Sequence, residues 1–204
     1  MALVRRQQRQ VLSPSSQPLD DQRAELRSPD PDRRRAAAVL LMDAQDAKQL
    51  LAAHVGIEED VVVRQAMLTA LVGCDDVAVA RTLAQLLRGE DAALRSAVAD
   101  TLGQMPATAA IIEELLGDQD PDVRVLSVML LRSLQLPAVP QWLLEVVERD
   151  THPNVVGAAL GELTEVGDAT MICAFERAPA RFPGDAFIAF SAATAASRFR
   201  EKAR

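Results

Sequence analysis

A short segment recurs along this chain about every 30 residues, and this repeat constrains the fold more than any other feature. Each copy is a polar turn that carries Asp or Pro, and four of the five copies end on Arg. The last residues of successive copies are separated by 30, 31, 29 and 32 positions. The five segments are Asp30–Arg34, Asp60–Arg64, Asp91–Arg95, Asp120–Arg124 and His152–Val156.

Each segment has the features of a helix start. Asp accepts hydrogen bonds from the first backbone N–H groups of a helix, and Pro is compatible with its first turn. With the last residue of each segment as position zero, positions −1, +3 and +7 share one helical face, which we expect to be buried. Position +7 is leucine in all five copies: Leu41, Leu71, Leu102, Leu131 and Leu163.

A second amphipathic stretch stands before each later turn, so the repeated unit is helix, turn, helix. Gly89, Gly117 and Gly167 fall where helix ends are expected, because glycine commonly ends helices. One helix pair cannot bury its own apolar face, but stacked pairs can. The stretches are 47–53, 79–87, 109–116, 139–147 and 170–175, and a sixth unit with a degenerate start is expected at 185–198.

The segment 120–131, which opens with Asp-Pro-Asp-Val-Arg and reaches Leu131, resembles the HEAT repeat. The period near 30 is similar to the short HEAT-like repeats of phycobilisome (bilin) lyases rather than to the longer forms of ~40–47 residues. The resemblance covers residues 20–198 and implies an all-α, right-handed α-solenoid of about five to six HEAT-like helix pairs. We expect a disordered tail at 1–19, which is rich in Arg, Ser, Pro and Gln, and a solenoid at 20–204.

Charge and hydropathy limit the classes of partner. Residues 20–204 carry 19 Lys or Arg against 29 Asp or Glu, a net charge of −10. Such an acidic body repels phosphate backbones, so we expect no nucleic-acid partner. A stretch of ~20 uninterrupted apolar residues is absent, and we expect no membrane partner either.

The residues of catalysis and metal binding are sparse. The two histidines, His54 and His152, are not followed by Glu, unlike the His-Glu pairs of di-iron HEAT-like hydroxylases. His152 stands where other repeats have Asp, so we expect it to cap a helix rather than to bind a metal. Cys74 and Cys173 form no CxxC motif and are expected to stay reduced in a cytoplasmic protein. We therefore expect no metal, no cofactor and no catalytic residues.

The predicted function is protein binding by an adaptor or assembly factor that is not an enzyme. In such solenoids the second helix of each pair usually lines the concave side, where positions +1, +5 and +8 form a mixed and partly apolar face. Exposed Met is common on adaptable binding surfaces. The alternative is a chaperone or lyase-like protein that handles a tetrapyrrole or another cofactor. The predicted concave-face residues are Arg35, Gln65, Thr69, Val72, Asp100, Val125, Met129 and Arg132.

Two groups of residues allow two interpretations each. Arg34 and its counterparts in the next three repeats either bind anions or pair with turn carboxylates of their own or the adjacent repeat, and we favour the pairing. The five phenylalanines, which all lie at or after Phe175, either seal the end of the stack or form a patch for self-association.

Overall fold

The computed structural model describes residues 19–202, and within this range the chain is a stack of helices without strands. Twelve α-helices follow one another along the chain, with four short 3-10 helices at 45–47, 85–88, 106–110 and 169–171. The helices are α1 (Leu19–Glu25), α2 (Pro31–Leu40), α3 (Lys48–Val55), α4 (Val61–Leu71), α5 (Val77–Ala84), α6 (Ala92–Leu102), α7 (Ile112–Leu116), α8 (Pro121–Leu134), α9 (Val139–Arg149), α10 (Pro153–Val166), α11 (Ile172–Arg181) and α12 (Ala186–Lys202).

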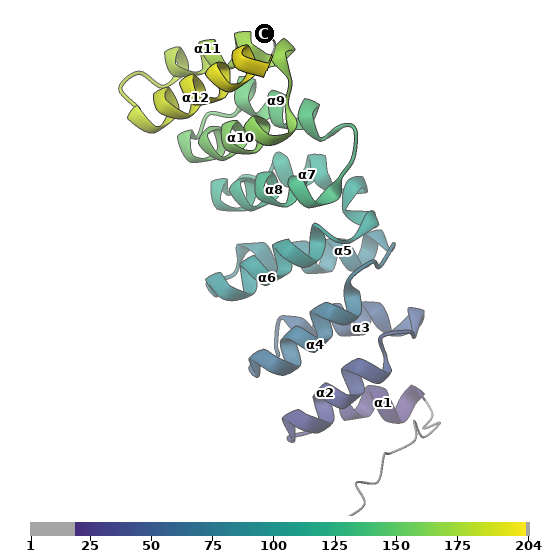
Figure 1. Cartoon of the computed structure of the whole chain (residues 1–204). Helices are drawn as coiled ribbons and strands as arrows, with labels where there is room; N and C mark the ends of the chain where they lie inside the picture. Colours follow the sequence, from purple (N-terminus) through teal and green to yellow (C-terminus); the bar gives the residue numbers. More distant parts are fainter. Residues whose placement is uncertain (1–18, 203–204) are drawn as a thin grey trace, which may run out of the picture.

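The helices pack as six consecutive pairs, from α1 with α2 to α11 with α12. Each even-numbered helix also packs on the next even-numbered helix, so these helices form one layer along the stack, and the odd-numbered helices form the other (Figure 1). The expected all-α solenoid of paired helices is confirmed. The expected tail at 1–19 lies almost entirely outside the described residues, and α1 begins at Leu19.

Aspartate side chains start the even-numbered helices as the repeat predicts. Asp30 and Asp120 each accept a hydrogen bond at 2.9 Å from the backbone N–H two residues later. Asp60 and Asp91 cap α4 and α6 in the same way. His152 is the exception: it stands at the N-cap position of α10, but its side chain makes no capping hydrogen bond. The capping role that we expected for His152 is therefore wrong.

The core runs the length of the stack and is built on the repeated leucines. All five leucines at position +7 are fully buried, as predicted, and so are most residues at positions −1 and +3. Arg33 is the exception at position −1. It lies on α2 in the first pair, and its side chain is exposed and pairs with Glu25 at 2.5 Å. Gly89, Gly117 and Gly167 end helices as expected.

Candidate partner-binding surface

The eight residues predicted for the binding face all lie on the even-numbered layer, on or directly after α2, α4, α6 and α8. Seven of them are exposed, and Val125 is partly buried. The same register on α10 continues this surface only in part, since Gly161 at position +5 is exposed. Gly157 at position +1 is buried, because the ring of Phe187 from α12 lies over it: a Cβ at Gly157 would come within 2.4 Å of a ring carbon. The candidate surface therefore spans α2 to α8.

A shallow groove crosses this surface between α6 and α8. It consists of two adjoining hollows of about 230 and 110 Å³, which share Ser96 and Leu126. The first is also lined by Val125, and the second by Asp100, Met129 and Arg132, so four of the eight predicted residues meet here.

Small residues on α6 explain the shape of this groove. Ser96, Ala99 and Gly103 follow one another along the side of α6 that faces α8. A Cβ at Gly103 would lie 2.9 Å from the Cβ of Ser133, so the two helices come closest at this point. Towards their N-terminal ends the short side chains of Ser96 and Ala99 leave the groove unfilled.

The groove combines an apolar centre with opposite charges at its edge. The Met129 side chain is 53% exposed beside Val125, and a flexible thioether adapts to differently shaped partners. Asp100 and Arg132 are both exposed at the second hollow. Arg132 also approaches Glu162 of α10 at 4.0 Å, and burial raises the pKa of the Glu162 carboxyl. This arrangement can hold a short apolar segment flanked by polar groups.

The repeated arginines pair with carboxylates of the following repeat, which confirms the structural interpretation. Arg34 binds Glu58 through two hydrogen bonds of 2.7 Å. The Arg34 guanidinium holds the pKa of Glu58 below its usual value. The ionised Glu58 carboxyl therefore stabilises the folded state at pH values above the ordinary pKa of Glu. This stabilisation is lost as the pH falls through the lowered pKa of Glu58. The other pairs are Arg64–Asp91 at 2.9 Å, Arg95–Asp122 at 3.6 Å and Arg124–Asp150 at 2.7 Å.

Replacement of Arg124 by Ala is expected to lower the free energy of unfolding by about 2 kcal/mol, the scale of a charged hydrogen-bonded pair that keeps some solvent contact. Arg124 donates to both carboxylate oxygens of Asp150 and to the backbone oxygen of Asp118; without it, the largely buried Asp150 carboxylate would keep the His152 N–H but lose its countercharge. Arg81→Ala is the matched control, because the Arg81–Glu114 pair is exposed. Urea unfolding followed by circular dichroism measures both; equal losses would contradict this account.

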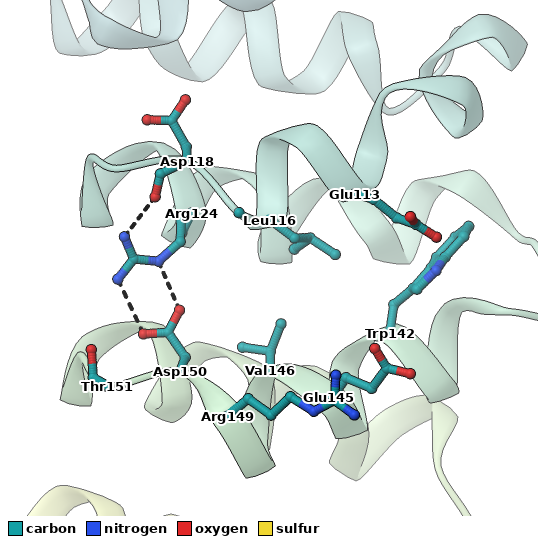
Figure 2. Close-up of a pocket in the computed structure, with 11 residues that line it drawn as sticks. Glu113, Leu116, Asp118, Arg124, Trp142, Glu145, Val146, Arg149, Asp150 and Thr151 are labelled. Carbon is teal, nitrogen blue, oxygen red and sulfur yellow. Dashed lines mark hydrogen bonds and ion pairs between the residues drawn. The ribbon is translucent and has the colours of Figure 1, made fainter.

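A larger cavity of about 490 Å³ opens on the side of the odd-numbered helices, between α7 and α9. Figure 2 shows Trp142 at one end of it, beside Glu113 and Glu145, and the Arg124–Asp150 pair at the other. Leu116 and Val146 form part of the wall between them. The sequence analysis did not predict this cavity. The single tryptophan of the chain, Trp142, could have indicated it, because a large, partly exposed ring often leaves space beside it.

The histidines and cysteines do not gather into a metal site within the described residues. His54 is buried, and its Nδ1 lies 2.9 Å from the Leu50 oxygen of its own helix. Cys74 is buried, which raises the pKa of its thiol, whereas Cys173 on α11 is exposed. Within residues 19–202, His, Cys, Asp and Glu side chains do not gather in threes or more as a metal site requires. In the same range, the helices are too short or too polar to cross a membrane.

Comparison with known proteins shows a distant structural likeness. No family model and no curated protein matches the chain. An archaeal HEAT-like repeats protein from Thermococcus onnurineus NA1 aligns at 16% identity with a TM-score of 0.47, over 90% of this chain and 87% of that one. An engineered protein aligns at 16% identity with a TM-score of 0.39, over 90% and 96%. Because both scores are low, the repeat register and the paired helices carry the assignment: the fold is a HEAT-like repeat solenoid.

Proposed function

We propose that this chain is a non-catalytic adaptor or assembly factor that binds another protein through the even-numbered layer, on the predicted concave face. The observation that carries the proposal is the groove between α6 and α8. It joins predicted residues from two repeats around an exposed Met129. An exposed apolar side chain at the centre of a polar rim is the usual anatomy of a protein-binding site.

The groove also indicates what kind of segment it receives. Val125 and Met129 lie one helical turn apart on α8, so an apolar side chain of a partner can contact both. Asp100 and Arg132 stand at the second hollow, where they can bind a basic and an acidic group of the partner. Adaptable Met contacts and a charged rim favour recognition of a short segment over enclosure of a small molecule.

The double replacement Val125→Glu and Met129→Glu tests the proposal. Two carboxylates would have to be desolvated in the bound state, so binding to the partner is expected to weaken by at least about a hundredfold, while the fold is kept. The matched control is Val61→Glu with Val62→Glu, because these valines are 71% and 59% exposed at the start of α4, outside the predicted face. Tagged wild-type protein first retrieves the partner, and titration with each variant follows; equal binding by all three proteins would refute the proposal.

A second proposal is that the chain handles a tetrapyrrole or a similar cofactor, in line with the resemblance of its repeats to those of bilin lyases. The cavity beside Trp142 favours it, because about 490 Å³ lies in the range of small-molecule sites. Trp142 is the single tryptophan, so its fluorescence reports on this cavity alone. Saturable quenching by a bilin, lost in a Glu113→Arg variant, would support this function, and unchanged emission would exclude it.

A further inference from the structure

The last described helix, α12, exposes one position that is buried in all the preceding repeats. The position eight residues after the N-cap is buried in all five earlier even-numbered helices, where each packs on the next: Ala38, Leu68, Ala99, Val128 and Leu160. Asp185 is the corresponding residue before α12, because its side chain accepts a hydrogen bond from the Ile188 N–H at 3.0 Å. The equivalent residue of α12, Ala193, is exposed.

The other core positions of α12 match those of the earlier helices. Ile188, Ala192 and Phe199 are buried against α10 and α11, as in an inner repeat. Phe190, one turn before Ala193, is 70% exposed. We call Ala186, Ala189, Phe190, Ala193 and Ser197 the terminal face; all five are exposed or partly exposed, and none carries a charge.

Two arginines of α12 are held away from the terminal face, and exposed Glu201 stands one turn after Ser197, at its end. Arg198 pairs with Glu165 of α10 at 2.6 Å, and Arg200 pairs with Glu176 of α11, so both guanidinium groups are held by the stack. Ala189 stands where Arg34, Arg64, Arg95 and Arg124 stand in the first four repeats. A helix face of a repeat stack that stays open to water is usually polar. A neutral face centred on an exposed phenylalanine does not fit this pattern.

We propose that the terminal face binds the same face of a second copy of this chain, with α12 packed against α12. The argument is continuity: in all five earlier even-numbered helices the position equivalent to Ala193 is buried, and each of these helices packs on the next even-numbered one (Figure 1). A twofold arrangement places neutral residues against neutral residues, and with the axis perpendicular to α12 the two helices are antiparallel, so their dipoles oppose. Alanines at 186, 189 and 193 allow close approach, and Phe190 supplies the apolar area.

The expected dimer is weak. Helix α12 has 17 residues and is therefore about 25 Å long, so the two faces bury much less than the ~1,600 Å² of a standard interface. Sedimentation velocity of the full chain, from about 1 to about 300 µM, is expected to show a shift from monomer to dimer.

Two neighbouring substitutions test the face itself. Ala193→Glu places a charge in the proposed interface and is expected to raise the dissociation constant at least about tenfold. Thr194→Glu is the matched control, because the position nine residues after the N-cap is exposed in every even-numbered helix, including Met129 and Thr194. It adds the same charge one residue away and is expected to leave dimerisation unchanged. Both side chains are exposed, and circular dichroism confirms that each variant folds.

The outcomes separate clearly. Loss of the dimer in the Ala193 variant alone, with a similar loss in Phe190→Ser, supports the proposal. Equal loss in the Thr194 variant, or a wild-type chain that stays monomeric at about 300 µM, overturns it. Assemblies larger than a dimer also overturn it, because they require a head-to-tail contact rather than a twofold one.

Discussion

Replacement of Leu102 by Ala is expected to lower the free energy of unfolding by about 2–5 kcal/mol, the range for a leucine removed from a packed core. Leu102 ends α6 in the middle of the stack and is fully buried. The neighbouring repeats hold it on both sides and cannot collapse into the space that it leaves. Urea unfolding followed by circular dichroism measures the loss.

Leu40→Ala is the control for this measurement. Leu40 stands one position before the buried leucine of its repeat and is 42% exposed, so its truncation removes little buried surface. We expect a loss well below that of Leu102→Ala. A loss under about 0.5 kcal/mol for Leu102→Ala would show that the repeat register is wrong.

Replacement of Phe199 by Ala is expected to unfold the last helix pair without unfolding the stack. Phe199 stacks on Phe175 with ring centroids 5.6 Å apart, and both rings are buried between α11 and α12. Truncation of a buried Phe costs about 3–5 kcal/mol. Because each repeat contacts only its neighbours, a terminal pair has one interface to hold it and separates first.

Hydrogen exchange measures this local effect. In the Phe199 variant, amides of α11 and α12 are expected to exchange much faster, whereas those of α4 and α6 keep their protection. Leu102→Ala provides the comparison, because it weakens interfaces on both sides of α6. Uniformly faster exchange in the Phe199 variant would mean that the whole chain unfolds as one unit, contrary to a one-dimensional stack.

The sequence predicted those features that every repeat contains. The polar turns, the buried leucines and the arginine pairs recur five or four times, so a single register places all of them. The prediction that the phenylalanines close the end of the stack is confirmed for two of them. Phe175 and Phe199 fill the last core layer, whereas Phe187 and Phe190 are exposed. Whether the exposed pair serves self-association stays a prediction.

Features that depend on one particular neighbour were not predictable. Gly157 is buried because Phe187 of the next repeat lies over it, and no sequence pattern within α10 predicts that contact. The first helix of the fourth pair is divided into a 3-10 segment at 106–110 and a five-residue α7, which leaves room for the cavity at Trp142. His152 replaces a capping Asp, but an imidazole is bulkier than a carboxylate, and its side chain does not bond to the helix start.

Site-specific photo-crosslinking tests the central claim, binding through the groove between α6 and α8, most directly. A photoreactive phenylalanine is placed at Met129, inside the groove, and in a second protein at Val62, which is exposed on α4 outside the predicted face. Each is irradiated with the partner that the wild-type chain retrieves. The account predicts a crosslink from position 129 that excess unlabelled wild type competes away, and none from position 62. A crosslink from 62 with none from 129 would contradict it.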